Sequence, residues 1–178
     1  MVHLVFDFDW SLVNENIDRI VFRRLAPVVH KYLEEQAGIR RGQWTNIVDE
    51  ALVLLQKDHN TSLEQIKAVM QELPTLNQVV ESIELVHSQG GDCFIVSDAN
   101  EFFINSFLES RNLSKFISRV ETNRSYFDEQ GYLRVTAHTP DPHGCKLCPP
   151  NMCKGKILVR FQNTIFYSVV LILRNRVI

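Results

Sequence analysis

The chain has 178 residues, of which 45% are hydrophobic and 22% are charged, and its formal net charge is −2. This composition is typical of one globular domain with a hydrophobic core, and it excludes wholesale disorder. The small net charge gives no basic footprint for nucleic acid, and the longest apolar run, 165–173, is shorter than the roughly 20 residues that cross a bilayer. Because the chain opens on a predicted strand without a signal-like segment, we expect a cytoplasmic protein with no nucleic-acid or membrane partner.

The first predicted strand, 4–6, leads directly into two acids, Asp7 and Asp9. Alternate side chains of an extended chain share a face, so we expect both acids to point the same way. At the carboxyl end of a buried strand they would lie in the crevice where open α/β sheets bind ligands. Paired carboxylates can bind a hard cation such as Mg²⁺, and one of them can attack phosphorus. Two solvated acids at a strand end would give the same pattern.

Helical segments are predicted next. Apolar residues recur at helical spacing over 17–38, 44–57, 63–73 and 75–87. Thr61 with Glu64, and Thr75 with Gln78, resemble the capping residues that begin the last two segments. We therefore predict a helical cap at 15–75, inserted after the first strand over the carboxyl end of the sheet. Residues 1–14 and 76–178 would form the core domain.

The second half of the chain alternates between strands and helices. The predicted elements are a strand at 93–96, a helix at 101–111, a short strand at 116–120, a hairpin over 126–135 that turns at 128–131, a loop at 138–150, a helix at 152–161 and a strand at 165–170. The second strand, like the first, ends in a polar cluster, 97–100. Alternating strands and helices predict an α/β fold with a parallel, Rossmann-like sheet.

Three stretches together resemble a known family. They are Asp7-Phe8-Asp9-Trp10-Ser11, Val96-Ser97-Asp98-Ala99-Asn100 and Cys148-Pro149-Pro150-Asn151-Met152-Cys153-Lys154-Gly155. In this order and spacing they resemble the haloacid dehalogenase (HAD) superfamily of phosphohydrolases. More narrowly, they are similar to its phosphoethanolamine/phosphocholine phosphatase family, which includes pyridoxal-phosphate and plant thiamine-phosphate phosphatase-like members.

The resemblance implies a role for each motif residue. Asp7 would be the nucleophile that forms a phospho-aspartate, and Asp9 the general acid and then the general base. The Asp7 carboxylate and the Asp9 backbone carbonyl would ligate Mg²⁺. Ser97 and Lys154 would hold the phosphoryl oxygens, and Ser11 would supply a further hydroxyl. Phosphoryl transfer depends mainly on positioning and charge neutralisation, which agrees with these roles.

Three further positions match the family's substrate-binding residues: Asp18, Asp98 and Asn100. Carboxylates beyond the phosphate site would favour a leaving group that bears a cation, such as choline or ethanolamine. Asp98 could instead be the N-cap of the helix at 101–111, and Asp18 an ordinary first-turn acid. Trp10 stands where most superfamily members carry glycine, which leaves the backbone shape of this loop open.

The loop before the last predicted helix carries residue types that commonly bind zinc. These residues are His143, Cys145, Cys148 and Cys153, and His138 lies nearby in the sequence. A reduced, partly buried loop without metal explains the same residues, because the second, distant ligand pair of a zinc ribbon is missing.

The resemblance breaks near residue 169. Family members continue into a Gly-Asp-Gly-x-x-Asp signature whose acids complete the Mg²⁺ shell, but no acid follows Asp141 here. We therefore expect the last strand and helix of the core to be missing or altered, and the activity to be impaired. The implied function is a Mg²⁺-dependent phosphomonoesterase acting on a small phosphorylated metabolite. The alternatives are a catalytically inactive fragment or a pyridoxal-phosphate or thiamine-phosphate phosphatase.

Overall fold

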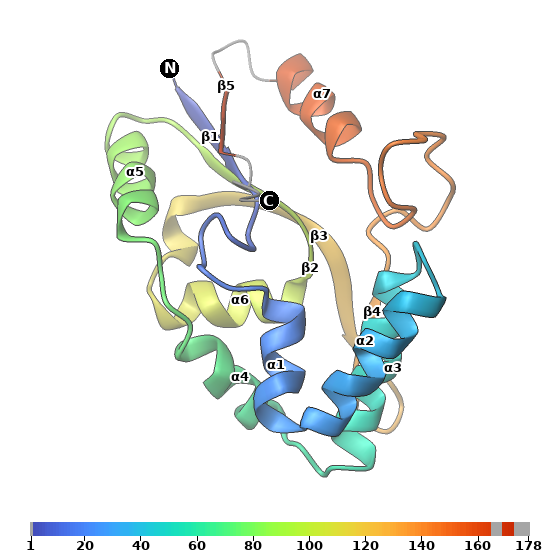
Figure 1. The fold of residues 1–178 in the computed structure, drawn as a ribbon. Helices are drawn as coiled ribbons and strands as arrows, with labels where there is room; N and C mark the ends of the chain where they lie inside the picture. Colours follow the sequence, from blue (N-terminus) through green and yellow to red (C-terminus); the bar gives the residue numbers. More distant parts are fainter. Residues whose placement is uncertain (1, 165–168, 173–178) are drawn as a thin grey trace.

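A mixed β-sheet organises the computed structural model, which describes residues 2–164 and 169–172 (Figure 1). The strands of the described residues are β1 (His3–Phe6), β2 (Cys93–Asn100), β3 (Ile117–Phe127), β4 (Leu133–Thr136) and β5 (Val169–Ile172), in the order β4-β3-β2-β1-β5. The β1–β2, β1–β5 and β2–β3 pairs are parallel, which confirms the α/β fold class. The β3–β4 pair is antiparallel. The sheet is therefore mixed, whereas the sequence predicted a parallel sheet.

The helices of the described chain are α1 (Ile17–Leu25), α2 (Pro27–Ile39), α3 (Trp44–Lys57), α4 (Leu63–Gln71), α5 (Asn77–Ser88), α6 (Glu101–Ser110) and α7 (Lys154–Thr164). A short 3₁₀ turn, Ser114–Phe116, precedes β3. Figure 1 shows α1 to α4 grouped beyond the carboxyl end of β1. Among residues 2–164 and 169–172, no helix combines the length and the apolar character that a membrane span needs.

Two details of the helical segment differ from the prediction. The region 17–38 is two helices, because Ala26 is extended (φ −152°) and Pro27 begins α2. Proline cannot donate the backbone hydrogen bond that would continue α1, but it suits the first position of a new helix. The capping box of α4 is formed by Ser62 and Gln65, one residue later than predicted, and α5 begins at Asn77 with no side-chain cap.

The strand boundaries were predicted less well. β2 continues to Asn100, and β3 runs to Phe127, so the short strand at 116–120 and the first arm of the hairpin are one strand. The predicted hairpin turn is confirmed, since the Asp128 carboxylate accepts the backbone N–H groups of Gln130 and Tyr132, both at 3.0 Å. The last strand is β5, and residues 165–168 of its predicted range lie outside the described residues.

The hydrophobic core lies on both faces of the sheet. Leu4 and Phe6 of β1 pack on one face, in a large cluster that includes buried residues of α5 and α6. The smaller cluster on the opposite face consists of Val5, Phe94, Val96, Met152, Ile157 and Phe161. Helix α7 therefore lies on the face of β1 to which Val5 points. Asp7, two residues after Val5, follows the strand on that side.

The hairpin connects the sheet to α3. The buried side chain of Gln56 accepts the N–H of Leu133 at 2.7 Å and donates to the carbonyl of Leu133 at 3.0 Å. Arg134 forms a two-pronged contact with Asp49 of α3, at 2.9 and 2.6 Å. These contacts fix α3, and the helices packed against it, relative to β4.

Candidate active site

Asp7 and Lys154 meet at the carboxyl end of β1. The Lys154 Nζ lies 2.7 Å from Asp7 Oδ2, and the backbone N–H of Phe8 donates to Asp7 Oδ1 at 2.8 Å. Lys154 is the first residue of α7, and the packing of Ile157 and Phe161 on the sheet directs that end of the helix toward Asp7. Burial alone would lower the pKa of Lys154, but the charges of Asp7 and Asp98 outweigh burial and raise this pKa. The site therefore keeps a lysine cation beside a carboxylate.

Asp9 is held by the start of α1 rather than by α7. Its Oδ2 accepts the side-chain amide of Asn16 at 2.8 Å, and its Oδ1 accepts the N–H of Ile17 at 3.3 Å. Burial, and then the charge of Asp18, raise the pKa of Asp9 well above its ordinary value. Burial thus favours the protonated form of this carboxyl, which is the form that a general acid needs. The sequence offered one signal for Asn16, which is a favourable N-cap residue before α1.

The two predicted serines are buried. Ser97, in β2 at the register shift between Val96 and Asn100, accepts the backbone N–H of Ala99 at 3.2 Å, and its own O–H has no acceptor among the described residues. The hydroxyl of Ser11 has no hydrogen-bond partner within the described chain. A buried hydroxyl without a partner is costly, and a bound anion would satisfy it.

Asp98 and Asn100 follow Ser97 but have different surroundings. The Asp98 side chain is 51% exposed, and its Oδ1 lies 3.4 Å from the Lys154 Nζ. The N-cap of α6 is Asn100, whose oxygen accepts the N–H of Phe103 at 3.0 Å, so the alternative interpretation of Asp98 as this cap is wrong. Asn100 is almost fully buried, which leaves only its unpartnered Nδ2 for the binding role predicted for it.

Asp18 belongs to the first turn of α1, yet it is buried rather than solvated. The indole N–H of Trp44 donates to its Oδ2 at 2.8 Å, while Oδ1 has no partner among the described residues. Burial raises the pKa of Asp18 to about 7, the indole hydrogen bond opposes this, and the charge of Asp98 adds to it. Asp18 therefore titrates near neutral pH.

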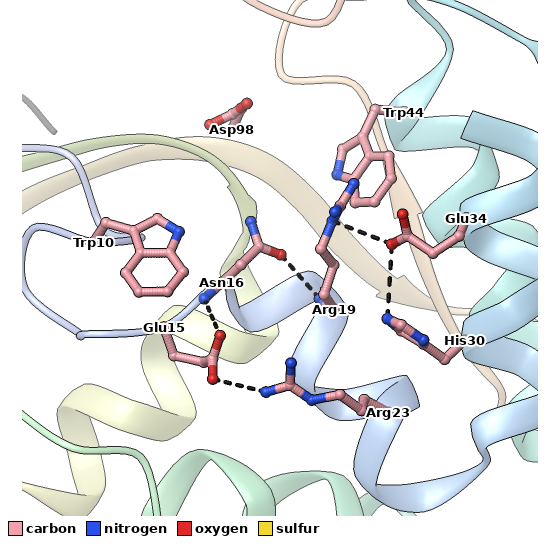
Figure 2. A pocket seen from close by; sticks show the side chains of 9 residues that line it. All are labelled: Trp10, Glu15, Asn16, Arg19, Arg23, His30, Glu34, Trp44 and Asp98. Atoms are coloured by element: carbon pink, nitrogen blue, oxygen red, sulfur yellow. Dashed lines mark hydrogen bonds and ion pairs between the residues drawn. The ribbon is translucent and has the colours of Figure 1, made fainter. Parts of the chain in front are cut away.

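A cavity of about 810 Å³ opens beside these acids (Figure 2). Its lining residues are Trp10, Glu15, Asn16, Arg19, Arg23, His30, Glu34, Trp44 and Asp98. Two of its cations are paired, since Arg23 contacts Glu15 at 2.8 Å and Arg19 contacts Glu34 at 3.3 Å. Asp98 connects the cavity to Lys154. The sequence analysis had singled out Asp98 and Trp10, but most of the lining comes from three helices, and the sequence alone did not identify those residues.

Trp10 occupies a tight loop between β1 and α1. The backbone N–H groups of Ser11, Leu12 and Val13 all donate to the carbonyl of Phe8, at 3.3, 3.0 and 3.2 Å. This turn gives Trp10 a φ of +60°, in the left-handed region that favours glycine. Trp10 thus adopts a backbone conformation that favours glycine, and its indole lies at the edge of the cavity in Figure 2.

A second group of reactive side chains lies in the loop before α7. The sulfur atoms of Cys145, Cys148 and Cys153 all lie within 4.8 Å of one another. The backbone N–H groups of Leu147 and Cys148 lower the pKa of Cys145 to about 7, whereas burial and the neighbouring thiols raise that of Cys148 to about 11. The two ring nitrogens of His143 contact the Pro149 carbonyl and the Cys145 N–H. Both ring nitrogens of His143 are thus engaged, and this histidine is not one of the residues that form the cluster.

Comparisons with known proteins match the chain to a phosphatase family. The family model described as "Putative Phosphatase" matches residues 2–170. The chain is 33% identical to inorganic pyrophosphatase 2 of Arabidopsis thaliana, with 89% of the chain and 56% of the relative covered. It is 32% identical to pyridoxal phosphate phosphatase PHOSPHO2 of Bos taurus, with 89% and 65% covered. The chain thus spans only part of the length of these relatives.

The fold also matches solved structures. A phospho-aspartyl intermediate analogue of phosphoserine phosphatase aligns with a TM-score of 0.62 at 18% identity, over 95% of this chain and 76% of that one. A HAD family hydrolase of Salmonella enterica aligns with a TM-score of 0.66 at 13% identity, over 96% of this chain and 55% of that one. At these identities the matches show the fold alone. The family match over residues 2–170 identifies the chain as a member of the family described as Putative Phosphatase.

Proposed function

We propose that this chain is a Mg²⁺-dependent phosphomonoesterase that acts on a small phosphorylated metabolite through a phospho-aspartate. The observation that carries the proposal is the 2.7 Å contact between Lys154 and Asp7. A carboxylate can approach a phosphate dianion only if cations offset the repulsion, and Lys154 supplies one at the nucleophile itself.

The chain's own groups account for both chemical steps. An oxygen of Asp7 attacks phosphorus, the bond from phosphorus to the leaving oxygen breaks, and Asp9 gives its proton to that oxygen. In the second step Asp9 takes a proton from water, whose oxygen displaces Asp7 and releases inorganic phosphate. Lys154 and the hydroxyls of Ser97 and Ser11 bind the phosphoryl oxygens throughout. The raised pKa of Asp9 supports its role as the proton donor.

The donor atoms at this end of β1 fit Mg²⁺. The Asp7 carboxylate and the Asp9 carbonyl are hard oxygen ligands, and Mg²⁺ commonly binds one or two carboxylates, waters and the substrate phosphate. Around Asp7 and Asp9, the described residues bring no third acid into a compact ligand cluster. We therefore infer a weak metal site that the substrate completes. When bound, the ion supplies positive charge at the transferring phosphoryl group.

We propose further that residues 15–75 act as a cap over a core formed by 1–14 and 76–178. The cavity supports this division, because α1, α2 and α3 supply most of its walls. The core contributes Trp10 and Asp98, the two lining residues nearest in sequence to the catalytic motifs. In this arrangement the core would bind the phosphoryl group and the cap the leaving group.

For the leaving group we propose a small cationic alcohol of the choline or ethanolamine type. Asp98 lines the cavity and Asp18 bonds the indole of Trp44, while the other two acids of the lining, Glu15 and Glu34, are paired with arginines. The indoles of Trp10 and Trp44 can pack against an ammonium group. A second candidate is pyridoxal phosphate, because the bovine relative bears that name and two indoles can also flank an aromatic ring.

Phosphate release tests the proposal. Purified protein is assayed with phosphocholine, phosphoethanolamine, pyridoxal phosphate and thiamine phosphate, with and without Mg²⁺. We expect Mg²⁺-dependent turnover of at least one of them and, in Asp7→Asn, a loss of about 10³-fold or more, as for other nucleophile deletions. Asp58→Asn, an exposed acid at the end of α3, is the matched control. Full activity of Asp7→Asn, or no turnover of any substrate, would contradict the proposal.

A further inference from the structure

The loop between β4 and α7, residues 137–153, needs something to hold it in place. It is long for a connection without helix or strand, and none of residues 137–150 is buried. Its two ends are tied down, since the Thr139 N–H donates to the Asn151 carbonyl at 2.8 Å and the Asn151 amide donates to Asn123 of β3 at 3.1 Å. Lys156 of α7 also contacts the carbonyl of His143, and the loop brings together the sulfur atoms of Cys145, Cys148 and Cys153.

The arrangement of these cysteines has the dimensions of a metal site. In tetrahedral zinc sites a Zn–S distance of about 2.3 Å places the sulfur atoms roughly 3.8 Å apart. The three sulfur atoms here already lie within 4.8 Å of one another, so a small rotation of each side chain would bring them onto one ion.

We propose that Cys145, Cys148 and Cys153 bind one Zn²⁺ as three thiolates. Binding forms three Zn–S bonds, and the three S–H protons pass to solvent without any change of oxidation state. Both ring nitrogens of His143 are already engaged, so the fourth position falls to a water molecule rather than to this histidine. The remaining cysteine, Cys93, lies buried in β2 and belongs to no such cluster among the described residues.

The ion would also position the candidate active site. Cys153 directly precedes Lys154, the residue whose Nζ contacts Asp7. Fixing Cys153 to Cys145 and Cys148 therefore sets where α7 begins and how its first side chain approaches β1. This consequence rests on the proposed phosphatase function, whereas the zinc site itself does not.

Metal analysis tests the site. The full chain is purified under reducing conditions, loaded with zinc, passed through a desalting column and analysed for metal by mass spectrometry. We expect about one zinc per chain in the wild type and in the control Cys93→Ala, and a loss of at least tenfold in Cys145→Ser and Cys148→Ser. Replacing zinc with Co²⁺ should give a thiolate-to-cobalt charge-transfer band that both serine variants lose. A wild-type chain that retains neither metal overturns the proposal, as does a disulfide among the three cysteines in the purified, metal-loaded protein.

A second measurement does not depend on how well the variants fold. Zinc is removed from the wild type with a chelator and then restored, and limited proteolysis is followed in each state. We expect cleavage within 140–150 to be faster without zinc and to return to its original rate after zinc is restored. Equal cleavage rates in the two states overturn the proposal. Stoichiometric zinc in a chain that hydrolyses no phosphate ester would leave the zinc site standing and would contradict only the proposed function.

Discussion

Lys154 and Asp7 are 147 positions apart in the sequence, yet their charged atoms lie 2.7 Å apart. The contact depends on two separate packing events: the parallel pairing of β1 with β2, and the docking of α7 on the face to which Val5 points. The side chains of Asp7 and Lys154 are only 14% and 29% exposed, so water screens this ion pair less than it would screen a surface pair.

Lys154→Met removes the cation beside the nucleophile. We expect the kcat/KM of phosphate release to fall by about 100-fold or more, because a group that offsets charge in the transition state is lost. The free energy of unfolding should also fall, by about 1–2 kcal/mol, since Asp7 keeps only its hydrogen bond to Phe8. Steady-state kinetics and urea unfolding measure the two effects.

Lys156→Met is the matched control for this prediction. Lys156 lies in the first turn of the same helix and contacts the carbonyl of His143 instead of Asp7. Its replacement should leave kcat/KM within a few fold of wild type. Equal losses in the two variants would show that the activity depends on the stability of α7 and not on the charge at Asp7.

The buried Asp18 predicts a pH dependence of stability. An unfolded aspartate has a pKa near 4, whereas burial raises the folded value to about 7. The folded state thus binds more protons between these two values, so this residue lowers the stability as the pH rises from about 4 to about 7, with no further change above. Asp18→Asn removes the effect and keeps an acceptor for the Trp44 indole.

The free energy of unfolding of Asp18→Asn minus that of wild type should therefore increase between pH 4 and pH 7. The expected increase is on the order of 2–4 kcal/mol, since each pKa unit corresponds to about 1.4 kcal/mol. Urea unfolding at several pH values measures it, with Asp58→Asn as the exposed control. A difference that does not change with pH would mean that Asp18 is already ionised in the folded protein at pH 4.

The sequence predicted elements best where the local signal was strong. α3 has the predicted bounds, Trp44–Lys57, because its apolar residues keep one helical face throughout. The break before Pro27 could have been predicted from the proline itself. The length of β3 could not, since several of its residues are exposed and its extent is decided by pairing with β2 and β4.

The residues of the candidate site also fall into those that the sequence indicated and those that only the packing brings together. The motifs indicated Asp7, Ser97 and Lys154 because each stands in a short, recognisable run. The bond between Asp18 and Trp44 joins residues 26 positions apart on two helices, and only the packing of α1 near α3 brings them together. The walls of the cavity are likewise formed by side chains from separate helices, and no sequence motif connects these residues.

Replacing Gln56 tests how much the contact between α3 and the hairpin contributes to the free energy of unfolding. In Gln56→Leu the N–H and the carbonyl of Leu133 lose their partner in a buried position. Each unsatisfied buried group costs about 1–3 kcal/mol, so we expect the free energy of unfolding to fall by roughly 2–4 kcal/mol. Thermal and urea unfolding measure it. The control is Gln71→Leu at the exposed end of α4, which should change stability by less than about 0.5 kcal/mol.

Two substitutions of Trp10 can separate the effect of backbone strain on stability from the effect of the indole on substrate binding. Trp10→Gly and Trp10→Ala both remove the indole from the cavity edge, but only glycine adopts a φ of +60° without strain. The glycine variant should be more stable than the alanine variant by about 1 kcal/mol, while both raise KM for the preferred substrate by a similar factor. Unfolding curves and steady-state kinetics of the pair measure the two quantities. Equal stabilities would indicate that the loop relaxes away from the left-handed conformation once the indole is gone, and an unchanged KM would exclude Trp10 from substrate binding.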